Sequence, residues 1–93
     1  MKIVINRCFG GFGISTRASE IYCAAKNIST KDFNDHDIPR NDPVLVNIVE
    51  TLGSEADGKF SELKIVDIPD DVDWIIEEYD GMEYVAERHR VWS

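Results

Sequence analysis

The stretch MKIVINRCFGGFGIST, residues 1–16, decides how the fold begins. Residues 2–8 are rich in β-branched apolar side chains, and this pattern predicts a well-buried strand. Three glycines and one phenylalanine follow, after which Ser15 or Thr16 can cap a helix. The opening stretch therefore predicts a strand that turns almost directly into a helix.

Two helices are expected in the first half of the chain. Apolar residues at helical spacing predict the first one, which Asn27 ends: Ala18, Ile21, Tyr22 and Ala25. Residues 28–41 are polar and rich in turn formers, so they are expected to form a loop. Asp42 and Pro43 are a cap and a first-turn residue, and they open a second helix that Gly53 ends. Its apolar stripe consists of Leu45, Ile48, Val49 and Leu52.

The second half of the chain predicts strands. Residues 63–68 form one strand, and residues 73–79 and 82–92 form a hairpin around Asp80-Gly81, because both residues of such a turn need positive φ. A helix is the alternative for residues 82–92, since Met82, Val85, Ala86 and His89 also have helical spacing. The two-residue turn and the β-branched and aromatic residues favour the strand.

The order β-α-α-β-β-β predicts a single α+β domain of 93 residues. Two helices are expected on one face of a mainly antiparallel sheet of about four strands. The other face must then be solvated or covered by a partner, and a homodimer would be one way to cover it. Four aromatic residues lie on the strands that would form that face: Trp74, Tyr79, Tyr84 and Trp92.

The glycine-rich loop is the first candidate site. A strand that ends in glycines and opens a helix lets backbone N–H groups converge on an anion, such as the phosphate of a small ligand. The residues predicted to bind it are Arg7, Gly10, Gly11, Gly13, Ser15 and Arg17. The spacing matches neither a P-loop nor a dinucleotide-binding fingerprint. The alternative is a tight turn packed by Phe9 and Phe12, with no ligand.

The chain is acidic, with a net charge of −8, and the charge is uneven. Residues 1–31 are net basic, whereas residues 67–87 contain nine acidic residues and no basic one. Direct nucleic-acid binding is not expected, because its affinity comes from neutralising phosphates with Lys and Arg. The net charge serves either solubility or docking onto a basic surface, including mimicry of nucleic acid. The uneven distribution suggests that the two ends of the chain attract each other in the fold or face different partners.

The closing hairpin is the second candidate site. A two-residue turn places Glu78 opposite Glu83, which is unfavourable unless an Arg or Lys from the basic N-terminal third, a metal ion or water neutralises them. The residues predicted to bind a partner are Glu78, Glu83, Glu87, His89, Arg90 and Trp92. No catalytic residues, metal site or cofactor are assigned, and Cys8 and Cys23 are expected to be reduced cysteines packed as small hydrophobes.

Several segments resemble a family of small, uncharacterised proteins encoded by bacteriophages and prophages. The segments that carry the resemblance are MKIVINRCFGGFGIS, DPVLVNIVETLG, LKIVDIPDDVDW and EEYDGMEYVAERHRVW. The resemblance implies an accessory protein in the cytoplasm of the host bacterium, and it supplies no catalytic residues.

Two functions are therefore expected. One is a non-enzymatic protein that binds a host macromolecule, such as a defence component, through an acidic and aromatic sheet face. The other is a protein, or a small enzyme, that holds a phosphate-bearing ligand at the glycine loop. No membrane association is expected, because no apolar run reaches the roughly 18–20 residues that span a bilayer.

Overall fold

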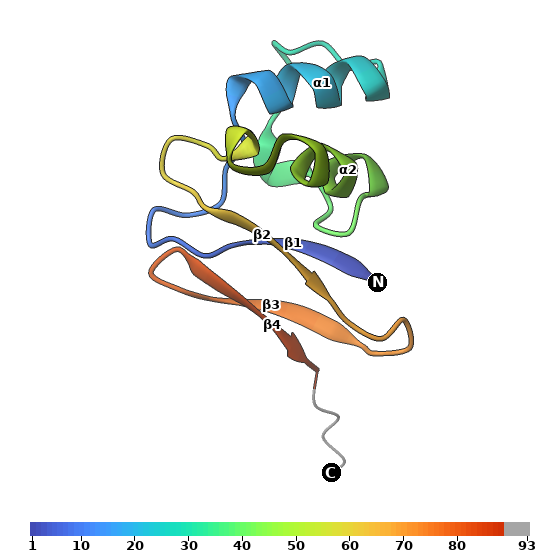
Figure 1. Cartoon of the computed structure of the whole chain (residues 1–93), viewed down its shortest axis with the longest axis vertical. Coiled ribbons are helices and arrows are strands. Elements are labelled where there is room, and N and C mark those ends of the chain that lie inside the picture. The colour runs from blue at the N-terminus through green and yellow to red at the C-terminus, as the bar shows by residue number, and fades with distance from the viewer. Residues whose placement is uncertain (89–93) are drawn as a thin grey trace.

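The computed structural model describes residues 1–88 of the chain (Figure 1). Its elements are β1 (Lys2–Asn6), α1 (Thr16–Lys26), η1 (Asp35–Asp37), α2 (Pro43–Leu52), η2 (Gly53–Ala56), β2 (Leu63–Asp67), β3 (Trp74–Tyr79) and β4 (Met82–Glu87). The order of strands and α-helices is the predicted β-α-α-β-β-β, and the α+β class is confirmed. Within these residues no helix has the length and apolarity needed to cross a membrane.

The expected single sheet is replaced by two antiparallel ribbons. β1 pairs with β2, and β3 pairs with β4, each as a separate two-stranded sheet. The arrangement of the helices also differs from the prediction. Figure 1 shows the elements as stacked layers, in which α2 packs on the β1–β2 ribbon and α1 packs on α2. Only one helix therefore covers the ribbon directly.

The ends of both helices are the predicted ones. The Oγ of Ser15 accepts a hydrogen bond from the N–H of Ala18 at 3.1 Å, and Asn27 ends α1 in the left-handed conformation with φ of 57°. Asp42 caps α2 through the N–H of Val44 at 2.8 Å, and Pro43 is its first residue. These local signals act within one helical turn and need no tertiary contact to be effective.

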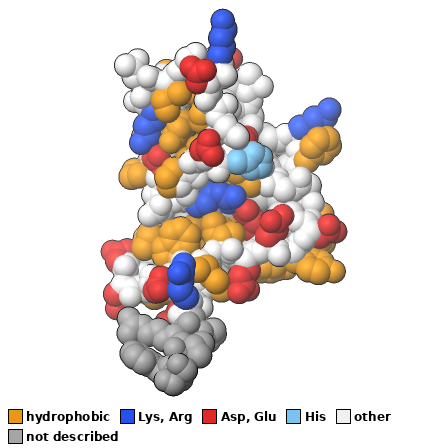
Figure 2. All heavy atoms as spheres, turned by 180° about the vertical axis from the view of Figure 1, so that it is seen from behind, with side chains coloured by type: hydrophobic (Ala, Val, Ile, Leu, Met, Phe, Trp, Pro, Cys, Tyr) orange, Lys and Arg blue, Asp and Glu red, His pale blue; other side chains and the backbone are white. Residues whose placement is uncertain are grey.

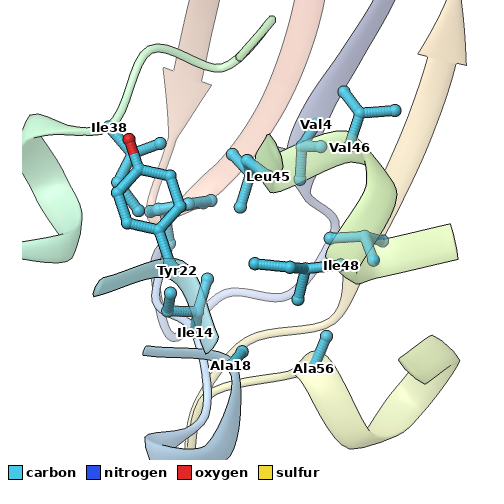
Figure 3. Packing of buried hydrophobic residues seen from close by; sticks show 11 residues of the cluster. Val4, Ile14, Ala18, Tyr22, Ile38, Leu45, Val46, Ile48 and Ala56 are labelled. Carbon is cyan, nitrogen blue, oxygen red and sulfur yellow. The ribbon is translucent and has the colours of Figure 1, made fainter. Parts of the chain in front are cut away.

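The main core lies between the two helices and one face of the β1–β2 ribbon (Figure 3). Val4, Ala18 and Leu45 are fully buried there, and Tyr22 is 5% exposed. The predicted stripe of α1 is correct only in part, because Ile21 is 39% exposed and Ala25 is exposed as well. α1 is an outer layer and contacts the core along one narrow side only, so half of its apolar stripe faces away.

The opposite face of the β1–β2 ribbon is covered by the β3–β4 hairpin. Ile3 and Ile5 point away from the helices, since side chains alternate along a strand, yet they are only 0% and 3% exposed. The hairpin turn is the predicted one, with φ of 53° at Asp80 and 91° at Gly81. The strand assignment after the turn is confirmed as far as Glu87, and the expected continuation over residues 89–92 lies outside the described residues.

Candidate functional site

The glycine loop is held between two other backbone segments. A Cβ atom added to Gly10 would lie 2.2 Å from the carbonyl oxygen of Phe60, and one added to Gly81 would lie 2.3 Å from that of Phe9. Gly58 approaches Gly13 in the same way, at 2.9 Å. Three backbone segments therefore meet at distances that only glycine permits, and this close approach accounts for Gly10, Gly58 and Gly81 without a ligand.

The polar groups at the end of the loop are bonded within the protein. The N–H of Ile14 donates to a carboxylate oxygen of Asp35 at 3.1 Å, and the N–H of Ser15 donates to the carbonyl of Ala56 at 2.8 Å. The carbonyl of Gly13 accepts from the N–H of Gly58 at 3.2 Å. Because the carboxylate of Asp35 sits at this helix start, it would repel an incoming phosphate.

The two arginines predicted to flank an anion do not converge on the loop. Arg7 donates to the carbonyl of Glu83 at 2.9 Å and lies over the ring of Tyr84 at 4.7 Å. Arg17 is paired with Glu55 at 3.8 Å, and both side chains are exposed. We therefore take the loop as a packing junction, in agreement with the alternative expected from the sequence. Phe12 packs as expected there at 7% exposure, but Phe9 is 61% exposed.

The edge of β1 that faces away from β2 explains why β1 and β4 do not join the two ribbons into one sheet. Val4 and Asn6 point their backbone N–H groups away from β2. The N–H of Val4 donates to the carbonyl of Arg40 at 2.8 Å, and that of Asn6 donates to the carboxylate of Glu83 at 2.8 Å. A loop carbonyl and a side chain thus occupy the positions that a neighbouring strand would use, so β4 lies beside β1 without a backbone ladder.

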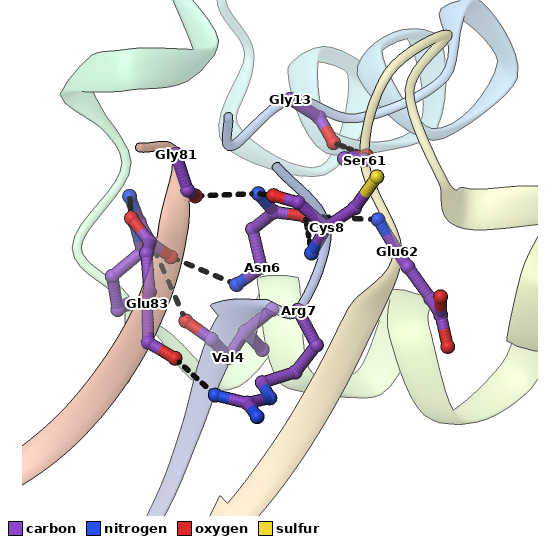
Figure 4. Close-up of polar contacts among 10 residues, drawn as sticks. Val4, Asn6, Arg7, Cys8, Gly13, Ser61, Glu62, Gly81 and Glu83 are labelled. Atoms are coloured by element: carbon purple, nitrogen blue, oxygen red, sulfur yellow. Dashed lines mark hydrogen bonds and ion pairs between the residues drawn. The ribbon is translucent and has the colours of Figure 1, made fainter. Parts of the chain in front are cut away.

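Asn6 is the centre of the polar contacts between β1, the glycine loop and the hairpin (Figure 4). Its Nδ2 donates to the carbonyls of Cys8 and Gly81, at 2.6 and 2.8 Å. Its Oδ1 accepts from the N–H groups of Cys8 and Glu62, at 3.1 and 2.9 Å. Asn6 is fully buried, and every polar atom of its side chain has a partner. This arrangement fixes the hairpin turn against the end of β1.

The neutralising cation for the acidic hairpin is Arg40. Glu83 does lie opposite Glu78, as the two-residue turn predicts. It is only 6% exposed, however, and both of its oxygens pair with Arg40, at 2.5 and 2.8 Å. Glu83 is therefore an interior residue and is left out of the partner-binding surface. Nothing in the loop sequence around Arg40 signals this role; the opposed glutamates are the only hint that a cation must lie nearby.

Of the other residues predicted to bind a partner, some are exposed and some lie outside the described part of the chain. Glu78 and Glu87 are exposed on the hairpin. His89, Arg90 and Trp92 lie outside the described residues. The structure adds Glu77, Asp80 and Tyr79 to the exposed set, and Tyr79 has 72% exposure. Figure 2 shows acidic side chains around the end of the molecule that carries the hairpin.

The outer edge of β3 is open in the part of the chain that the structure describes. The N–H of Arg88 donates to the carbonyl of Asp73 at 2.8 Å, and bonding residues alternate along an antiparallel pair. Trp74, Ile76 and Glu78 therefore direct their backbone groups away from β4. Within residues 1–88, β3 has no second strand beside it, and these backbone groups have no backbone partner outside the hairpin.

Comparisons with protein-family models, curated proteins and solved structures find no match to this chain. They do not test the resemblance to phage-encoded proteins, which stays a prediction.

Proposed function

We propose that this protein is a non-enzymatic binding protein that takes up a basic, extended segment of a partner protein along the outer edge of β3. The observation that supports the proposal most is the open edge of this strand beside carboxylates that have no basic partner within residues 1–88. The resemblance to phage-encoded proteins adds that the partner would be a protein of the bacterial host, such as a defence component.

Backbone pairing would supply the affinity. An extended peptide can add a strand to an open edge, where its N–H and C=O groups complete the ladder. On β3 the available groups belong to Trp74, Ile76 and Glu78, which follow one another at every second residue. Natural proteins usually protect long open edges, because such edges pair with other chains. An open edge of this kind is consistent with use as a binding site.

The charges select the partner. Glu77, Glu78 and Asp80 are exposed, and none of them lies within 4 Å of a basic group in residues 1–88. A strand rich in Lys or Arg would place opposite charges beside them, which favours association. A second copy of this chain would bring glutamates together, so the same charges oppose a homodimer formed through β3.

The test uses a defined probe. A peptide of about eight residues that alternates Lys with Val or Thr is long enough to pair with β3. We expect it to shift the backbone amide signals of Trp74, Ile76 and Glu78 in NMR spectra. A peptide of the same length with Glu in place of Lys should not bind. The double variant Glu77→Lys/Glu78→Lys should weaken binding of the basic peptide by about tenfold or more.

Two controls separate edge pairing from general charge attraction. Glu20→Lys/Asp32→Lys makes the same charge change at exposed positions on the helical side, and it should alter the affinity little. Ile76→Pro removes an outward N–H and is tolerated at a sheet edge, so it should abolish binding while the protein stays folded. Binding that survives Ile76→Pro, or amide shifts confined to other elements, would refute the proposal. A concentration-dependent dimer that uses the same amides would replace the partner with a second copy.

A further inference from the structure

A shallow cleft lies between the β1–β2 ribbon and β4 on the side away from the helices. It has a volume of about 240 Å³. The lining residues are Ile5, Arg7, Lys64, Val66, Tyr84 and Val85. Three of these side chains are aliphatic, two are basic and one is aromatic. The cleft therefore combines an apolar floor with positive charge.

The two basic side chains of the cleft lack acidic partners among the described residues. Most of the described cations are paired with an acid, including Lys2, Lys26 and Arg40. Arg7 and Lys64, in contrast, have no acidic group within 4 Å among residues 1–88. In a protein of net charge −8, two cations without acidic partners at one cleft form a local positive site.

Arg7 is held in place before any ligand arrives. Its guanidinium donates to the carbonyl of Glu83 at 2.9 Å and lies over the ring of Tyr84, with 4.7 Å to the centroid. This is the only side-chain hydrogen bond of Arg7 within the described part of the chain, so its other N–H groups stay available. A planar guanidinium with free N–H groups suits a carboxylate, which it can bind through two parallel hydrogen bonds.

We propose that this cleft binds a small monocarboxylate with an aromatic or aliphatic body. The carboxylate pairs with Arg7 and Lys64, and the apolar body lies against Ile5, Val66 and Val85. The volume is below the roughly 300–1,000 Å³ of sites for drug-sized ligands, so the body is about one ring in size. A free phosphate would leave the apolar floor uncovered. The proposal does not depend on the binding of a peptide at β3, because it uses a different surface.

The test is a titration with benzoate, at constant ionic strength because salt screens charges. We expect a dissociation constant of about 1 mM, given the small size of the ligand. Methyl signals of Ile5, Val66 and Val85 should shift in NMR spectra as benzoate is added. Benzyl alcohol has a similar body without the charge, and inorganic phosphate has the charge without the body. Both should bind at least about tenfold more weakly than benzoate.

Variants connect the binding to the two cations. Lys64→Gln changes an exposed side chain and should leave the fold intact, yet it should weaken benzoate binding severalfold. Arg7→Gln should weaken it more, with an unchanged circular-dichroism spectrum as the check on folding. Lys31→Gln, at an exposed loop position, is the matched control and should have no effect.

Three results would overturn the proposal. Equal binding of benzyl alcohol would reduce the cleft to an apolar hollow, and equal binding of phosphate would reduce it to a general anion site. Benzoate shifts that persist unchanged in Lys64→Gln and Arg7→Gln would place the ligand elsewhere.

Discussion

Arg40 and Glu83 are 43 residues apart in the sequence and form a bidentate ion pair in the interior. The guanidinium of Arg40 also lies over the ring of Phe12 at 3.6 Å. Through this pair the loop before α2, the glycine loop and the hairpin are joined at one point. The pair replaces the backbone ladder that would otherwise connect β1 to β4.

Removing one member of this ion pair should be costly. Glu83→Ala leaves the charge of Arg40 half-buried and removes the acceptor for the N–H of Asn6. We expect the free energy of unfolding to fall by about 3–5 kcal/mol, as for other broken interior pairs. Urea unfolding measures this change. The matched control is Glu50→Ala, which breaks the exposed Lys2–Glu50 pair and should cost less than about 1 kcal/mol. Similar losses in both variants would contradict an interior role for Glu83.

Replacing the side-chain amide of Asn6 with a carboxylate should destabilise the protein. Asn6→Asp replaces the Nδ2 donor with an acceptor, which then faces the carbonyls of Cys8 and Gly81. We expect at least about 2–3 kcal/mol of destabilisation at neutral pH, because buried acceptors lose their donor. Asn47→Asp, on the exposed side of α2, provides the comparison and should be close to neutral. Unfolding curves that coincide for the two variants would show that the contacts of Asn6 contribute little.

The glycines should differ in their tolerance of alanine. Gly10→Ala places a methyl group against the backbone of Phe60, so one of the two loops must move; we expect a loss of about 2–3 kcal/mol or more. Gly11 has open space around it and a φ of 93°. Gly11→Ala therefore costs only the strain of an alanine at positive φ, about 1–2 kcal/mol of the free energy of unfolding. Melting temperatures in the reverse order would contradict the packing-junction role of the loop.

Stability should depend on pH through the contact between Tyr22 and Asp42, whose oxygens are 2.8 Å apart. Burial and Asp42 raise the pKa of Tyr22 from 10.0 to about 12. The unfolded chain then loses this proton first, so stability falls as the pH rises from about 10 toward 12. Burial acts to raise the pKa of Asp42, but hydrogen bonds from Tyr22 and Val44 and the ion pair with Lys26 outweigh it and lower that pKa below 3.8.

At acidic pH the stability changes in the opposite direction and falls as the pH falls. The contribution of Asp42 is present above its unfolded pKa of 3.8 and is lost as the pH falls through the lower folded value. Tyr22→Phe should remove the alkaline loss and weaken the acid one, and urea unfolding across the pH range measures both. An alkaline loss of equal size in Tyr22→Phe would assign it to another group.

Local signals in the sequence were sufficient for the secondary structure. Ser15, Asn27 and Asp42 mark helix ends through contacts within one turn, and Asp80-Gly81 specifies its turn through backbone conformation alone. The same locality explains the partial error in α1. Periodicity shows that Ile21 is apolar at a helical position, but it does not show which layer the helix will occupy.

For a related reason, the two arginines predicted to flank the glycine loop do not converge on it. Sequence proximity suggested that Arg7 and Arg17 flank the same loop, yet a strand end and a helix start project their side chains in unrelated directions. Arg7 instead reaches the hairpin, which lies more than seventy residues further along the chain.

The sequence by itself therefore determined the order of the strands and α-helices and the ends of the two α-helices, because caps, turns and periodicity act over a few residues. Tertiary structure decided how the ribbons are layered, which acids are buried and which cleft Arg7 and Lys64 line together. Those outcomes depend on contacts such as Arg40–Glu83 and Asn6–Gly81, whose partners are far apart in the chain and carry no local signal. Only the folded backbone brings such partners together, since hydrogen bonds and ion pairs require contact at about 3 Å.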